Sequence, residues 1–102
     1  STRVIQLSSN CAIGGDNSPA VIIKTHHAIT NVQEIIKDVC ATQMKLKEIK
    51  IEGLQVVINT AKDLDPFTLL YEALNTVVEF FVLELSCVVD ISELKNFKST
   101  LL

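Results

Sequence analysis

Apolar residues recur at helical spacing over residues 31–49. The positions that follow the i, i+3, i+4, i+7 pattern are Val32, Ile35, Ile36, Val39, Cys40 and Leu46. Charged residues fall on the opposite side, as is typical of an amphipathic helix with one buried face. Thr30 and Gln33 form a T-x-x-Q pattern, which indicates a capping box at a helix start. The sequence therefore predicts a first helix over residues 31–49.

The most apolar stretch of the chain is VVEFFVLELSCVV, residues 77–89, in which ten of thirteen residues are apolar. Upstream, Asp65 and Pro66 are typical of a helix start, because aspartate caps free N–H groups and proline fits the first turn. Asp90 and Glu93 give a second start signal. These boundaries predict a long helix over residues 66–88 and a final helix over 91–101. A strand through the same stretch would exceed the usual length of about 5–6 residues.

Residues 47–59 fit two patterns. Beyond Gly53 the apolar positions match a period of 3.6 better than a period of 2, which favours a short helix over residues 51–63. Ile49 and Ile51 alternate with charged residues, and Val56 and Val57 are β-branched, which favours a strand. A strand here would make the fold α+β, with the N-terminal segment extended into a sheet.

Two short β-like runs, residues 3–7 and 20–25, flank the turn-rich segment SSNCAIGGDNSP. We expect them to form a hairpin or an extended arm. The predicted fold is therefore mainly α: a four-helix orthogonal or bundle-like domain with an extended N-terminal arm or short β-hairpin, and α+β as the alternative. Residues 1–27 form the arm, and residues 28–102 form the helical body of the same domain.

Composition and charge narrow the function classes. The apolar fraction is 48% and the mean hydropathy is +0.36, which is high for a soluble domain. The net charge of −3 argues against nucleic-acid binding, which depends on clustered Lys and Arg. Residues 1–51 carry +2 and residues 52–102 carry −5, so the two halves should attract each other, within one chain or between subunits. Acidic residues recur too often in residues 66–88 for a membrane span.

The three cysteines, Cys11, Cys40 and Cys87, show no zinc or redox spacing. Cys40 and Cys87 fall on the apolar sides of predicted helices, where a free thiol behaves as a small hydrophobe. Reduced core cysteines are the first interpretation, and a disulfide from Cys11 to a helix is the second. The cellular compartment stays undetermined.

Signals for chemistry are weak. His26 and His27 could supply metal ligands, but adjacent side chains are expected to point in different directions, and no ligand follows at i+4. Glu72 and Glu79 lie about 10 Å apart along the predicted helix, which is far for a carboxylate pair acting on one bond. The segment IGGDNS lacks the spacing of a phosphate-binding loop. We expect no enzyme activity, no metal site and no cofactor.

The surplus apolar surface of the predicted 66–88 helix is the main functional signal. We expect a non-catalytic interaction module that self-associates, as a homodimer for instance, or binds a protein partner through this surface. The alternative is a carrier that holds a lipid or another apolar small molecule between this helix and the 31–49 helix. The residues predicted for the interface or apolar pocket are Phe80, Phe81, Val82, Leu83, Val77, Ile36 and Val39.

Overall fold

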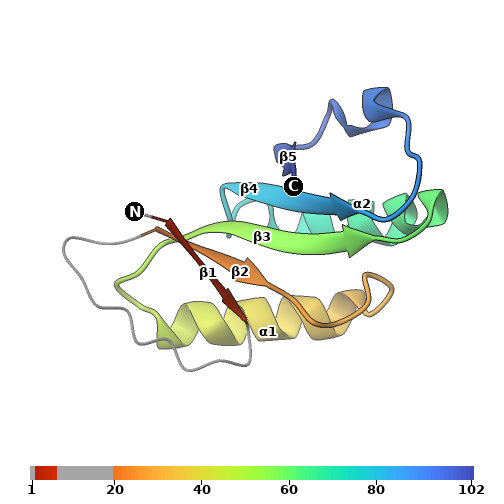
Figure 1. Cartoon of the computed structure of the whole chain (residues 1–102). Coiled ribbons are helices and arrows are strands. Elements are labelled where there is room, and N and C mark those ends of the chain that lie inside the picture. The colour runs from red at the N-terminus through yellow and green to blue at the C-terminus, as the bar shows by residue number, and fades with distance from the viewer. Residues whose placement is uncertain (1, 7–19) are drawn as a thin grey trace.

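The computed structural model describes residues 2–6 and 20–102, and these form an α/β fold with a five-stranded parallel sheet. The strands follow one another in chain order across the sheet, with β1 and β5 at the two edges. Figure 1 shows β2, β3 and β4 side by side, with β1 drawn across them in this view. The strands are β1 Thr2–Gln6, β2 Ala20–Lys24, β3 Ile51–Ile58, β4 Phe80–Leu85 and β5 Ser99–Leu101. The helices are α1 Val32–Lys45 and α2 Leu64–Leu74, with short 3-10 turns η1 Ala61–Asp63 and η2 Ile91–Leu94. The predicted mainly α, four-helix fold is therefore wrong, and so is the α+β alternative, because all strand pairings are parallel and the helices connect successive strands.

Each strand pairs in parallel with the strand before it in the chain. Ile23 lies opposite Leu54, Leu54 opposite Phe81, and Phe81 opposite Ser99. These register partners are separated in sequence by 31 residues between β2 and β3, by 27 between β3 and β4, and by 18 between β4 and β5. A strand followed by a helix or a 3-10 turn, repeated in chain order, is the arrangement of βα solenoids.

Both helices cover the same face of the sheet. Ile23, Leu54 and Phe81 share one row of the register and are each at most 1% exposed. They pack in a single core with Ile35 and Val39 of α1 and with apolar residues of α2. The α2 residues are Phe67, Leu70 and Leu74. Because α1 and α2 also contact each other, one apolar layer joins the helices to one face of the sheet.

The first helix is confirmed as α1, although α1 ends at Lys45 rather than at residue 49, and its predicted cap is not confirmed. Asn31 occupies the N-cap position and no side-chain hydrogen bond caps the helix, so the Thr30–Gln33 capping box is wrong. Cys40 is an exposed free thiol, which corrects its predicted place on the buried side. Cys87 is also free and packs partly against the core, in the segment after β4. Cys11 and its predicted disulfide lie outside the described residues.

The predicted 66–88 helix is wrong, because α2 ends at Leu74 and the chain continues as strand β4. Asn75 ends the helix: its side-chain Nδ2 donates to the Tyr71 carbonyl at 2.8 Å. In β4, Phe81 and Leu83 face the helices and belong to the core, whereas Val82, also buried, points to the other face. A parallel strand buried on both faces reads as a continuous apolar run, and that run resembles a buried helix in sequence.

The start of α2 also differs from the prediction. The helix begins at Leu64 rather than with Asp65 as its cap. The Asp63 carboxylate instead accepts hydrogen bonds from the backbone N–H groups of Asn59, at 2.9 Å, and Thr60, at 3.2 Å. This aspartate closes the turn from β3 into η1.

Residues 51–58 form strand β3, so the strand alternative is correct and the 51–63 helix is wrong. The predicted final helix is reduced to η2 and is followed by β5. The Asp90 cap is nevertheless confirmed, because its carboxylate accepts a hydrogen bond from the Ser92 N–H at 3.0 Å.

The two N-terminal runs are strands, but they pair in parallel and so do not form a hairpin. The turn-rich segment between them lies outside the described residues.

Two ion pairs join the basic first half to the acidic second half within one chain. Lys24 Nζ lies 3.9 Å from Glu84 Oε1, and Lys50 pairs with Glu79. All four side chains are more than one third exposed, so each pair contributes at most about 1 kcal/mol. None of the helices in the described residues is long and apolar enough to cross a membrane.

The neighbouring phenylalanines of β4 provide a test of the strand assignment. Phe81→Ala should lower the free energy of unfolding by about 3–5 kcal/mol, because it empties a fully buried site. Phe80→Ala removes the same atoms from the other side of the strand, where the ring is only partly buried, and should cost about 1 kcal/mol. Urea unfolding measures both. Equal losses would contradict the alternation, and Phe81→Leu provides a milder variant if Phe81→Ala does not fold.

Asp90 gives a prediction about pH. Hydrogen bonds from Ser92 hold the pKa of the Asp90 carboxyl below its ordinary value. A depressed pKa means that the ionised carboxylate stabilises the folded state above the ordinary pKa, and that this contribution is lost as the pH falls through the folded value. Titration of the Asp90 side-chain carbon signal by NMR should show a lowered midpoint, and Ser92→Pro, which lacks both the hydroxyl and the N–H donor, should move it back up.

Candidate functional site

The sheet has a second face, opposite α1 and α2, that none of the described helices covers. Alternation along the strands places on it the residues Ile22, Lys24, Gly53, Gln55, Val57, Phe80, Val82 and Glu84. We call this surface the open face. Its apolar members do not belong to the core cluster that joins the helices to the sheet. The open face is therefore a separate surface rather than an extension of the core.

An aromatic ring packs against the backbone of the open face. Gly53 pairs with Phe80 across β3 and β4, and a Cβ placed on Gly53 would lie 2.9 Å from the Phe80 ring carbon Cε2. A side chain at position 53 would force the ring to shift, so glycine leaves the space in which the ring lies. The ring is only partly buried there. Phe80 thus presents a partly exposed aromatic surface on the open face, packed on Gly53.

Polar groups flank this ring along the next rows of the sheet. Glu84 Oε1 accepts a hydrogen bond of 3.4 Å from Gln55 Nε2 and lies 3.9 Å from Lys24 Nζ. Gln55 is 5% exposed and Val82 is 6% exposed, so neighbouring side chains pack closely around the centre of the face. Lys24 and Glu84 remain more than one third exposed. The open face therefore combines apolar contact area with one cation and one anion at accessible positions.

The residues predicted for an interface or apolar pocket are divided by the structure. Phe80 and Val82 lie on the open face. Phe81, Leu83 and Val39 are completely buried in the core. Val77 and Ile36 are partly buried and pack against that core. Of these two, Phe80 is partly exposed and can contact another molecule, whereas Val82 is 6% exposed and packs beneath its neighbours.

A surface groove lies where the predicted carrier would hold its ligand, between α1 and α2. Its volume is about 570 Å³. The start of α1 and three residues of α2, Pro66, Leu69 and Ala73, line it. Leu69 is 60% exposed, and Ile36 is the one residue of the predicted set that lines the groove.

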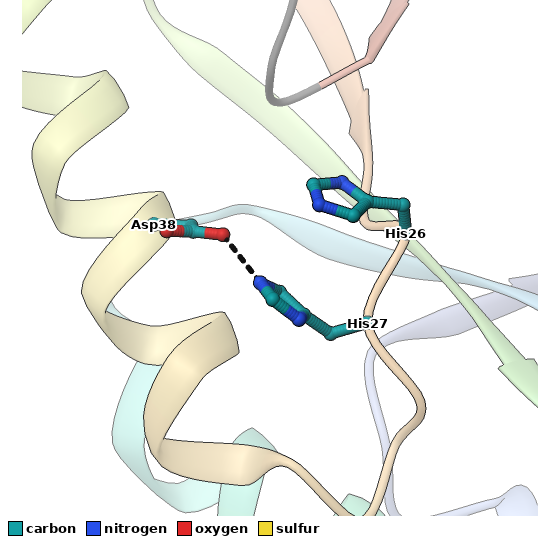
Figure 2. Close-up of side chains that lie close together, drawn as sticks. All are labelled: His26, His27 and Asp38. Carbon is teal, nitrogen blue, oxygen red and sulfur yellow. Dashed lines mark hydrogen bonds and ion pairs between the residues drawn. The ribbon is translucent and has the colours of Figure 1, made fainter.

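A cluster of metal-ligating side chains lies beyond the carboxyl end of β2. His26, His27 and Asp38 each offer one ligand atom, and these atoms all lie within 4.8 Å of one another. His27 Nε2 lies 2.8 Å from Asp38 Oδ2, and the two imidazole rings stack with centroids 4.6 Å apart (Figure 2). The histidines come from the loop after β2, and the aspartate comes from the middle of α1.

The local backbone explains why adjacent histidines lie on the same side. The chain bends at His27, and the His27 N–H donates to Thr25 Oγ1 at 3.1 Å. In an extended strand the two side chains would alternate, whereas this bend brings the rings together. The expectation that they point in different directions is therefore wrong. Sequence reasoning missed Asp38 as their partner because it lies eleven residues away, on the polar side of a helix.

Comparison with protein-family models, curated proteins and solved structures finds no significant match.

The packing of the Phe80 ring on Gly53 can be tested by a double-mutant cycle. Gly53→Ala should displace the ring, because the added methyl group meets it at 2.9 Å. In a Phe80→Ala background the same substitution meets no ring, so its effect on stability should differ by about 0.5–2 kcal/mol. Urea unfolding of the four proteins measures this coupling energy. A coupling within error of zero would contradict the packing of Phe80 on Gly53.

Proposed function

We propose that this chain is a non-catalytic interaction module that binds a protein partner through the open face. The observation that carries the proposal is a parallel sheet with helices on one face and, on the other, the partly exposed Phe80 packed on Gly53. Parallel sheets normally have both faces covered, because their strands are apolar on both sides. Where a solenoid leaves one sheet face free, that face is an extended binding surface.

The composition of the open face supports a protein rather than a small apolar ligand. Aromatic rings that lose little conformational freedom on binding are typical anchors of protein interfaces. A mixture of apolar contacts with a few accessible charges is typical of interfaces between proteins that also exist separately. Phe80 supplies the anchor, and Lys24 and Glu84 supply charges of both signs.

The simplest partner is a second copy of the chain. In a two-fold dimer the same surface occurs on both subunits, so self-complementary charges are required. Lys24 and Glu84 on one open face satisfy this requirement, because each could pair with its opposite on the other subunit. In this form of the proposal the contact surface is the partly exposed Phe80 of strand β4, in place of the apolar surface of the predicted 66–88 helix.

Two matched variants test the proposal. Phe80→Asp places a charge on the open face, and Leu69→Asp places the same charge on the exposed side of α2. Sedimentation equilibrium should show an association that Phe80→Asp abolishes and Leu69→Asp preserves. If the wild type is a monomer throughout, peptides selected from a displayed random library on the immobilised protein should bind Phe80→Asp at least about tenfold more weakly. Association or peptide binding that depends equally on both positions would contradict the open face as the binding surface.

The carrier alternative rests on the groove between α1 and α2, whose 570 Å³ lies within the usual range for ligand pockets. The carrier alternative predicts the opposite effects of the two variants. Leu69→Asp should abolish binding of a fluorescent fatty acid, and Phe80→Asp should leave this binding unchanged. The same two proteins therefore distinguish the alternatives.

A further inference from the structure

We propose that His26, His27 and Asp38 bind one divalent transition-metal ion, with Zn²⁺ as the expected occupant. This site is separate from the open face and does not depend on the proposed function. Figure 2 shows the two imidazoles and the carboxylate converging from the loop after β2 and from α1. Two imidazoles with one carboxylate is a donor set that zinc and its neighbours in the first transition series accept.

The distances are those of a site that needs only small side-chain rotations. Zinc takes nitrogen and carboxylate oxygen ligands at about 2.0–2.2 Å, so tetrahedral ligands lie about 3.3 Å apart. The observed separation of His27 Nε2 and Asp38 Oδ2 is 2.8 Å, and the largest separation in the cluster is at most 4.8 Å. An entering ion would widen the short contact and draw the longer ones together. Rotation of the side chains can supply both changes, because none of the three residues is buried.

The ligands are held by rigid parts of the fold. Thr25 is 5% exposed, its N–H donates to the Gln55 carbonyl at 3.3 Å, and its hydroxyl accepts from the His27 N–H. Ile29, 3% exposed, anchors the other end of the loop. Asp38 precedes Val39, which is fully buried in the core and fixes this turn of α1. An ion would therefore bind between two elements that the core already positions.

The surroundings bear on the type of ion. Glu34, Thr42 and Lys45 line the same depression, which has a volume of about 420 Å³. Glu34 adds a negative charge, whereas the Lys45 ammonium opposes a cation. Magnesium and calcium prefer sites made of oxygen ligands, so the two imidazoles favour zinc, nickel or copper instead. Three protein ligands leave a coordination position of zinc for water, as in sites that remain open to solvent.

The test uses Zn²⁺ alone with the whole chain carrying Cys40→Ser, because Cys40 is an exposed thiol that could bind zinc itself. Since the sequence contains only two histidines, imidazole ¹H–¹⁵N spectra report each ligand separately. Titration should shift the signals of both rings and saturate at one equivalent. Calorimetry should show an affinity that Asp38→Asn lowers at least about tenfold, and that His26→Gln and His27→Gln each lower similarly.

Control variants separate ligation from simple packing of the loop. Glu34 lines the same depression but is not a proposed ligand, so Glu34→Gln should leave the Zn²⁺ affinity within about twofold of the wild-type value. Asp38→Glu keeps the carboxylate and should retain most of the Zn²⁺ affinity. Circular dichroism confirms that each variant folds. The proposal is overturned if binding does not saturate below 1 mM, a concentration of about the order of the weakest metal sites. Shifts of only one ring, or an unchanged affinity of Asp38→Asn, would also overturn it.

Discussion

The structure depends on the burial of one apolar row that runs across the strands. Ile23, Leu54 and Phe81 lie side by side in neighbouring strands, and both helices pack on the face that carries them. The aromatic residues of α2 extend this contact: the ring of Phe67 meets the edge of Phe81 at a centroid distance of 5.4 Å. Because each helix connects two adjacent strands, covering this row places α1 and α2 on the same side and leaves the opposite side of the sheet to Phe80 and its neighbours.

The sequence predicts some of these elements and not others, for identifiable reasons. The segment that forms α1 has a single buried face, so the spacing of Ile35 and Val39 predicts a helix correctly. Strand β4 lies between β3 and β5, and Phe81 and Val82 are both buried although they point in opposite directions. No alternation remains visible in such a segment, and the helix-start signals at Asp65 and Asp90 do not show that a strand lies between them. In β3 the helical spacing after Gly53 was accidental, because the register of Leu54 with Phe81 decides the strand.

Both candidate sites depend on tertiary contacts that the sequence alone does not reveal. Glu84 and Lys24 are sixty residues apart in the chain, and only the parallel register of β2, β3 and β4 brings them together. The bend at His27, fixed by the Thr25 hydroxyl, is likewise a property of the folded loop. A sequence can indicate that two adjacent histidines follow a strand, whereas the carboxylate that meets them is found only when the helix is placed. The sequence predicts that Phe80 is part of an apolar surface that needs a partner. The structure places this side chain on the open face, over Gly53.

The strand order also has a consequence for how the chain folds. Every paired strand is joined to its partner by a connection that closes within 31 residues, and no described strand pairs with one more distant in the chain. The entropy of closing such loops rises only slowly with length, so each strand can be added once its predecessor is formed. Folding can therefore start in one unit and propagate to the next, as in other quasi-one-dimensional proteins. We therefore expect β2, β3 and β4, which each pair on both sides, to form before the terminal strands β1 and β5, which pair on one side.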